Sequence, residues 1–292
     1  MAWSNGLAEW IEGDTAYLSV AFSWRLPDAY QRAVWLRSAG YKVRAGGGGM
    51  FAPSLRKYLS DVAELGGEVN ALIHHNPLAT IASRGCPVGC YFCIVPKMEG
   101  LNFTLLPDFT PRPILCDNNL SALPVEYQDY IIEKFQKADV PLRDANSGFE
   151  PRTFDEGTYR RWKAINKGAW RFAYDETAEG DDVYKVTRIL KDISPRLKQV
   201  YVLIGNEPFD SCYRRIMQVI EWGCEPYVQP LIALNSLVRK PIVRHDWTER
   251  KLMDLARWTN RWVWRSIPFS EYGTPPKPMC SGQGQTASLL PM

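Results

Sequence analysis

Three cysteines stand close together in the segment RGCPVGCYFC, with the spacing C-x3-C-x2-C. A closed structural zinc site needs four donors in a tetrahedral arrangement, and the segment offers no fourth donor nearby. Cysteine thiolates are also the usual protein ligands of a [4Fe–4S] cluster, which has four irons to ligate. Three thiolates in one tight loop therefore predict a cluster with one iron left open for a small molecule, held by Cys86, Cys90 and Cys93.

The residues around these cysteines favour a compact loop. Gly85, Pro87 and Gly89 interrupt the segment, and glycine allows backbone angles that other residues resist. Such a loop can fold around a cluster. A zinc site, or three cysteines that share no ligand, is the alternative interpretation of the same spacing.

The motif resembles the C-x3-C-x-aromatic-C signature of the radical S-adenosylmethionine (SAM) superfamily, with Phe92 at the aromatic position. The resemblance extends over roughly residues 70–265 and is closest in wording to the cobalamin-type and methylthiotransferase branches. It implies a [4Fe–4S] cluster whose open iron chelates the amino and carboxylate groups of SAM. It also implies an external electron donor of the flavodoxin or ferredoxin type, reductive cleavage of SAM, and a 5′-deoxyadenosyl radical that abstracts hydrogen from a substrate.

Composition agrees with a globular enzyme. The chain has 292 residues, of which 46% are hydrophobic and 23% charged, as is usual for soluble proteins. Its polar first residues, with Glu9, Glu12 and Asp14, predict neither a signal peptide nor a membrane span. Seven cysteines are an odd number, so a disulfide framework is not expected. We therefore expect a cytoplasmic protein with no membrane partner.

Short apolar runs alternate with helical patterns from residue 78 onward. The run QVYVLI is the clearest strand, because its continuous apolar character is typical of a strand buried on both faces of a parallel sheet. Strands are predicted at 78–83, 112–116, 142–146, 170–174, 199–204 and 226–234. Helices are predicted at 124–138, 154–166, 183–193, 212–222 and 248–262. Six consecutive strand–helix units predict a parallel α/β fold, and the resemblance implies a partial (βα)6 TIM-type barrel over residues 76–265.

The ends of the chain differ from this pattern. Residues 1–75 predict a small α/β unit, with strands at 16–22, 41–45 and 68–73 and helices at 27–38 and 54–65. The unit is similar to part of the cobalamin-binding domain found in one branch of the superfamily. It is shorter and has no D-x-H-x-x-G motif, so we expect no requirement for cobalamin. Residues 266–292, rich in Pro, Gly and Ser, predict an irregular tail.

Polar residues follow the ends of the predicted strands, where ligands gather in parallel α/β folds. Asp117 and Asn118, after the second strand, offer oxygens to the ammonium group of SAM. Asn146 and Ser147, after the third, suit its methionine or ribose, and Asp175, after the fourth, suits ribose hydroxyls. An ordinary turn or a satisfied polar loop group is the alternative at each position.

The last two strands complete the predicted SAM site. After the fifth strand, the sequence is a poor match to the family's Gly-x-Ile-x-Gly-x-x-Glu patch beside adenine, and Gln229 in the sixth could face the same pocket. Five further residues are therefore predicted, from the resemblance, to bind the cofactor. They are Ile204, Gly205, Glu207, Gln229 and Phe92. No catalytic residue follows from the sequence.

One segment bears on the substrate. Residues 239–265 hold eight Arg or Lys and three acids, a net charge of +5, against +3 for the whole chain, and four tryptophans are interleaved. Basic side chains with aromatic rings suit a nucleic-acid backbone and its bases, and some members of the superfamily that this chain resembles occur in phages that hypermodify DNA bases. A DNA or RNA base is therefore the first substrate expected. The alternative is an amphipathic helix whose tryptophans pack on the core.

Two further alternatives stay open. The first is an enzyme that acts on a small metabolite or peptide. The second, from another class, is a non-catalytic iron–sulfur binding or redox protein, which would need the cluster but no SAM pocket. The sequence does not separate isomerisation, group transfer and C–H functionalisation, because the cofactor performs the difficult step and the pocket selects the outcome.

Overall fold

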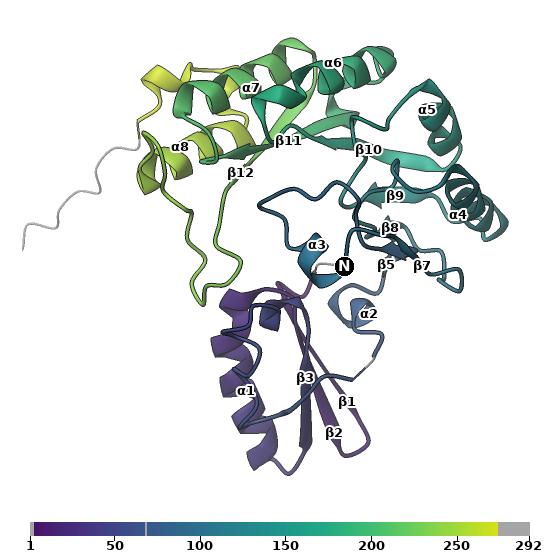
Figure 1. Ribbon diagram of the computed structural model, residues 1–292, viewed down its shortest axis with the longest axis vertical. Helices are drawn as coiled ribbons and strands as arrows, with labels where there is room; N and C mark the ends of the chain where they lie inside the picture. Colours follow the sequence, from purple (N-terminus) through teal and green to yellow (C-terminus); the bar gives the residue numbers. More distant parts are fainter. Residues whose placement is uncertain (1–2, 68, 274–292) are drawn as a thin grey trace, which may run out of the picture.

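The computed structural model describes residues 3–67 and 69–273, and its first part is a small α/β unit. Its four-stranded sheet has the order β1–β2–β3–β4, in which β1 and β2 are antiparallel and the other pairs parallel. Helix α1 (Leu26–Ser38) lies against this sheet (Figure 1), and its buried Ala29, Ala33 and Leu36 recur at helical spacing. The strands span Leu7–Glu12, Thr15–Val20, Lys42–Gly46 and Glu64–Leu65.

Three predicted elements of this N-terminal unit (residues 3–75) are confirmed. They are β2, β3 and α1, expected at 16–22, 41–45 and 27–38. The strand expected at 68–73 is wrong, because the short helix α2 (Leu72–His75) begins within it. Residue 68 itself lies outside the described residues.

The helix expected at 54–65 is also wrong. Successive turns occupy the segment, with hydrogen bonds such as that from Tyr58 N–H to Leu55 O, 3.0 Å. These turns still bury Leu55, Leu59 and Val62 against the unit's core. The spacing of the apolar residues therefore predicted which side chains are buried. Successive turns bury the same side chains as the expected α-helix would have done.

Six strands form one parallel sheet in the order β5–β8–β9–β10–β11–β12. Neighbouring strands of this sheet follow one another along the chain, as successive strand–helix units require. Within the described residues β5 and β12 are its two edges, so the sheet is open and does not close into a barrel. The strands span Ala79–Thr80, Ile114–Leu115, Leu142–Ala145, Asn166–Ala173, Lys198–Ile204 and Glu225–Pro230.

The longer helices that follow β8 in the chain lie along one face of this sheet (Figure 1). Two apolar clusters fill the space between these helices and the sheet. One is rich in aromatic rings such as Trp162 and Phe154, and the other includes Ile216 and Trp258. None of the helices in the described residues is long and apolar enough to cross a membrane. The helices are α4 (Val125–Lys137), α5 (Glu156–Lys163), α6 (Gly180–Ile189), α7 (Phe209–Glu221) and α8 (Glu249–Asn260).

The first strand–helix unit departs from the prediction. The strand expected at 78–83 is divided into β5 and β6 (Ser83–Arg84), and β6 pairs antiparallel with β7 (Thr104–Leu105). Its helix is reduced to α3 (Val95–Met98), a single turn. The three cysteines lie between β6 and α3, so a loop occupies the place of the first crossover helix.

The chain between β12 and α8 also departs from the prediction, because β12 ends at Pro230 and not at residue 234. Residues 231–244, here called the arm, leave the sheet and reach the N-terminal unit (Figure 1). Ser23 Oγ donates a hydrogen bond to Ser236 O at 2.6 Å, and the Arg239 guanidinium lies 5.6 Å from the centre of the Trp24 ring. The arm thus fastens the two parts of the molecule together.

Candidate functional site

The cysteine loop (residues 85–94) has a backbone that requires its glycines. Gly85 has φ +87°, and a Cβ there would lie 2.2 Å from Asn102 O. Gly89 also has a positive φ, +70°, a region that L-residues with a Cβ avoid. Cys86 N–H donates to Gly100 O at 3.3 Å, which ties the start of the loop to the residues after α3.

All three thiols of this loop are partly buried. The backbone N–H of Val95 lies 3.4 Å from Cys93 Sγ, and the Asn119 side-chain amide lies 3.7 Å from Cys86 Sγ. Cys93 N–H donates to Cys90 O at 3.0 Å and closes a turn between the second and third cysteines. Donors to sulfur are the contacts by which proteins tune iron–sulfur clusters.

Burial, reinforced by the charges of Asp175 and Cys93, raises the pKa of Cys90 to about 11. Burial likewise raises the pKa of Cys93. Without a bound cation both groups are therefore neutral thiols at pH 7, which makes them poor nucleophiles. A metal centre reverses this preference, because it binds thiolates and releases their protons.

The loop supplies the ligand type that a [4Fe–4S] cluster requires, three cysteine thiols. Among the described residues no three His, Cys, Asp or Glu side chains are grouped as for a single ion, whereas a cluster distributes its thiolates over separate irons. The fit comes from three cysteines in one loop, from the two N–H donors that face Sγ atoms, and from the half-buried surroundings. Cys86, Cys90 and Cys93 would hold the cluster.

Residues after β8 hold the loop in position. Asp117 is fully buried and accepts hydrogen bonds from Ala82 N–H, at 2.9 Å, and from the Ser83 hydroxyl. Burial raises its pKa to about 6, although these bonds and Arg84 act in the opposite direction. The described hydrogen bonds of Asp117 are thus directed at the strand that leads into the loop. Its predicted contact with SAM stays a prediction.

Glu99 accepts several hydrogen bonds in the same region, and the sequence did not predict it as a site residue. Its carboxylate accepts from Arg84 Nη1 at 2.9 Å, from Gly85 N–H at 2.9 Å and from Asn118 Nδ2 at 2.7 Å. Asn118, predicted to contact SAM, is therefore engaged with the ends of the loop. The only signal in the sequence was an acid directly before Gly100, where the chain leaves α3.

The segments after β9 and β10 offer polar groups to a ligand. Asn146 and Ser147 are exposed. Asp175 follows β10 and is near enough to Cys90 to affect its pKa. Burial and then the charge of Glu179 raise the pKa of Asp175 to about 7, while Arg215 lowers it. Asp175 thus places a carboxyl group near Cys90, with the cations Arg152 and Arg215 also close by. Its predicted contact with the ribose hydroxyls of SAM stays a prediction.

A buried arginine organises the turn after β11. Arg215 of α7 is fully buried and donates to the carbonyl oxygens of Tyr174 and Leu203 at 2.5 and 2.9 Å. Its Nε lies 3.0 Å from Glu207 Oε2, and Nη2 donates to Asn206 Oδ1 at 3.2 Å. It joins the ends of β10 and β11. Nothing in the local sequence pattern distinguishes it from the exposed Arg214 beside it.

The other predicted SAM residues divide into two groups. Ile204 is buried in the core and Glu207 is paired with Arg215. Their predicted contacts with SAM stay predictions. Gly205 has φ +88° and keeps the turn after β11 narrow. Gln229 is exposed on β12, on the face opposite the buried Val228. It lies on the uncovered side of the sheet, where the sequence analysis expected a pocket.

The basic tryptophan-rich segment mostly packs on the core. Trp247 and Trp258 are buried, and their indole N–H groups donate to Glu207 O and Ile267 O at 2.8 and 3.0 Å. Trp262 is exposed, with a hydrogen bond of 2.7 Å to Glu225. Trp247 and Trp258 therefore pack on the core, as the alternative interpretation of this segment expected. Their rings are not available to stack on bases.

Comparisons with known proteins add no assignment. No protein-family model matches this chain, and no curated protein matches it in sequence.

Proposed function

We propose that this chain is a radical SAM enzyme whose [4Fe–4S] cluster is held by Cys86, Cys90 and Cys93. One observation carries the proposal: the three-cysteine loop lies against residues that follow several parallel strands. Asn119, after β8, contacts Cys86, and the charge of Asp175, after β10, reaches Cys90. Ligands of parallel α/β folds gather at this edge of the sheet.

The open sheet supports the same proposal. Its sequential parallel order, with helices on one face, is compatible with the partial (βα)6 barrel of the TIM type that we propose. Arg171, Tyr201 and Tyr227 point to the uncovered face, since they alternate along β10, β11 and β12 with buried neighbours. We assign this face to the interior of the partial barrel, beside the cysteine loop.

Cys86, Cys90 and Cys93 would hold the cluster, which would supply the one electron needed to break the sulfonium S–C5′ bond of SAM, giving methionine and a 5′-deoxyadenosyl radical able to take hydrogen from the substrate. The chain's own groups bind and orient. The N–H of Val95 and the amide of Asn119 face the cluster thiolates. Asn146, Ser147 and Asp175 are available for the polar groups of SAM. An external electron donor of the flavodoxin or ferredoxin type is required.

Iron and sulfide analysis tests the cluster. Anaerobic reconstitution should load about four irons and four sulfides per chain, and Cys86→Ala, Cys90→Ala and Cys93→Ala should each lose most of them. Cys224→Ala, a buried cysteine outside the loop, is the matched control and should keep the wild-type content. Undiminished iron in all three loop variants, or stoichiometric zinc after anaerobic purification, would contradict the assignment.

The substrate class has two candidates. A nucleic-acid base was expected from the basic tryptophan-rich segment, but two of its tryptophans are buried and hydrogen-bonded. A small molecule is favoured by a cavity of about 400 Å³ that Cys93 lines.

A further inference from the structure

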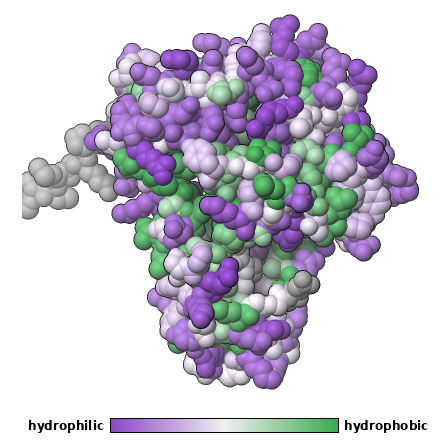
Figure 2. All heavy atoms as spheres, in the orientation of Figure 1, coloured by the Kyte–Doolittle hydropathy of each residue, from purple (hydrophilic) through white to green (hydrophobic). Residues whose placement is uncertain are grey.

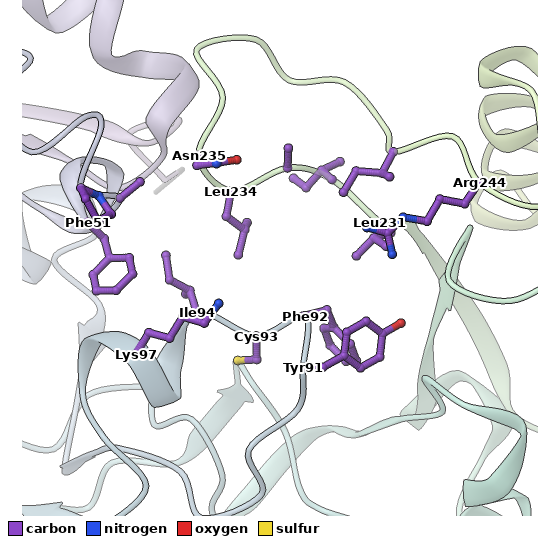
Figure 3. Close-up of a pocket in the computed structure, with 15 residues that line it drawn as sticks. Phe51, Tyr91, Phe92, Cys93, Ile94, Lys97, Leu231, Leu234, Asn235 and Arg244 are labelled. Carbon is purple, nitrogen blue, oxygen red and sulfur yellow. The ribbon is translucent and has the colours of Figure 1, made fainter.

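A cavity lies beside the cysteine loop. It is lined by residues of that loop, by residues 51–53 of the N-terminal unit and by residues of the arm. Its volume is about 400 Å³, within the usual range of small-molecule sites, roughly 300–1,000 Å³. Figure 3 shows the lining side chains, and Figure 2 shows apolar residues gathered where the N-terminal unit meets the rest of the molecule. The size admits a molecule of nucleotide or smaller dimensions.

Three anchored segments build this cavity. The arm is attached to the N-terminal unit at Ser23 and is doubled back on itself by a bridge between Ile232 and Pro241. The cysteine loop contributes Tyr91 and Phe92, whose rings meet edge to face at 5.2 Å between centroids. The cavity therefore exists only because the arm and the N-terminal unit close over the loop, which gives that unit a role at the site.

The cavity has apolar walls and two positive charges. Phe51, Ile94 and Leu234 are among its apolar lining residues. Lys97 and Arg244 are its charged lining residues, and no Asp or Glu is among the described residues that line it. In Figure 3 both cationic side chains extend toward the cavity, from opposite sides. Neither has a hydrogen-bond or ion-pair partner among the described residues.

We propose that this cavity binds a small molecule with an apolar or aromatic body and an anionic group, carboxylate or phosphate, held by Lys97 and Arg244. The inference deepens the proposed function and rests on it in one respect: the ligand is the substrate of the radical reaction. Cys93 lines the cavity, so a ligand bound there lies next to the cluster. Guanidinium and ammonium groups bind both kinds of anion through charge-assisted hydrogen bonds.

SAM does not suit this cavity. It carries two positive groups, the sulfonium and the ammonium, against one carboxylate, whereas two cations and no acid are among the described residues that line the cavity. Glu176 and Glu207 lie outside this lining, although their charges reach Tyr91. Asp175, which does not line the cavity, has a charge that reaches Cys90, as does that of Arg152, and its carboxylate suits the ammonium group of SAM. SAM is therefore assigned to the edge of the cluster toward Asp175, with the anionic substrate in the cavity beside it.

Three naphthalene probes separate the contributions of charge and apolar surface. The full chain, purified without iron, is titrated calorimetrically with 2-naphthoate, 2-naphthyl phosphate and the neutral 2-naphthamide. We expect at least one anion to bind about tenfold more tightly than the amide, since only the anions can form charge-assisted hydrogen bonds with Lys97 and Arg244. Comparison of the two anions identifies carboxylate or phosphate as the preferred group.

Variants assign the binding to this cavity. Lys97→Gln and Arg244→Gln should each weaken the preferred anion about five- to tenfold and leave the amide within about twofold. Phe51→Ala should weaken all three probes, because it removes an apolar wall. Arg214→Gln removes an exposed arginine of α7 that does not line the cavity; it is the control and should change nothing. Melting temperatures of the four variants show whether each remains folded.

The outcomes are distinct. A preference for an anion that both Lys97→Gln and Arg244→Gln reduce would support the inference. Equal binding of anions and amide, no saturable binding of either anion, unchanged binding in both variants, or displacement of the probe by SAM would each contradict it. These titrations need neither cluster nor SAM turnover. Failure of the chain to cleave SAM would therefore contradict the proposed function and leave the binding result standing.

Discussion

Asn119 Nδ2 lies 3.7 Å from Cys86 Sγ, and this contact joins the turn after β8 to the first cysteine of the loop. The same side chain accepts a hydrogen bond from Ala122 N–H through Oδ1 at 3.2 Å. Asn119 therefore presents its amide N–H to the sulfur in a fixed orientation. If Cys86 is a cluster ligand, this donor stabilises its thiolate.

Asn119→Ala should keep most of the iron but weaken the cluster's function. Outer contacts of metal ligands typically change affinity or activity about 10- to 100-fold, so SAM cleavage should fall by about tenfold. Loss of an N–H donor also destabilises the more negative, reduced state, so the reduction potential should become more negative. Potentiometric titration followed by electron paramagnetic resonance measures that shift. An unchanged potential with unchanged cleavage would show that the contact has no functional effect.

Arg215→Met should strongly destabilise the protein. The change leaves Glu207 without its cationic partner and removes the donors to two carbonyl oxygens, and breaking a buried ion pair costs about 3–5 kcal/mol. Arg214→Met, one residue away and exposed, should change the free energy of unfolding by less than about 0.5 kcal/mol. Urea unfolding measures both. Equal effects of the two substitutions would refute the anchoring role of Arg215.

Asp117 should make stability depend on pH. Its pKa in the folded state is about 6, against an ordinary value of 3.8, chiefly because it is buried. Between these values the folded state binds more protons than the unfolded state, so this group lowers the free energy of unfolding as pH rises from about 4 to about 6.

Asp117→Asn removes that titration. The pH slope of the free energy of unfolding should become less negative in this window, by up to about 1.4 kcal/mol per pH unit. Other acids with raised pKa values, such as Asp144, act in the same direction in both proteins, so the difference between variant and wild type isolates Asp117. Parallel slopes from urea unfolding at pH 4, 5 and 6 would contradict this assignment.

Two tryptophans separate packing from nucleic-acid binding. Trp258→Ala should cost about 3–5 kcal/mol of stability, because its ring is in the core. Trp262→Ala should leave the melting temperature nearly unchanged, because this ring is exposed. If the surface binds DNA or RNA, only Trp262→Ala should lose stacking, about 1–3 kcal/mol. Fluorescence anisotropy with single-stranded DNA and RNA measures this loss, and salt-independent or undetectable binding would remove the nucleic-acid substrate from consideration.

The sheet and its helices could largely be predicted from the sequence, because their signals are local. The run at 199–204 became β11, and α8 begins where Thr248 caps it by accepting from Lys251 N–H at 3.1 Å. The helix expected at 54–65 failed, since apolar spacing specifies burial but not the backbone hydrogen-bond pattern. Strand β1 was not predicted. It is an edge strand paired only with β2, and its Glu9 and Glu12 make its sequence too polar to resemble a buried strand.

The site was less predictable, because its contacts are distant in the sequence. The spacing of the cysteines singled out the loop, and Asp175, at a strand end, has a charge that reaches Cys90. Their roles in binding a cofactor stay predictions. Asp117 and Asn118 were assigned to SAM by their type, yet their hydrogen bonds fasten the loop. Glu99 and Arg215 were missed, since only tertiary contacts reveal that each holds several partners.

Formation of 5′-deoxyadenosine tests the central claim most directly. Anaerobically reconstituted protein is incubated with dithionite and SAM, and the products are quantified by mass spectrometry, with Cys90→Ala and Cys224→Ala treated in parallel. Wild type and Cys224→Ala should form 5′-deoxyadenosine and methionine in equal amounts, slowly even without substrate, and Cys90→Ala should form neither. Wild-type protein with an intact cluster that yields no 5′-deoxyadenosine, alone or with anionic aromatic or nucleic-acid candidates, would contradict the account and support a non-catalytic iron–sulfur protein.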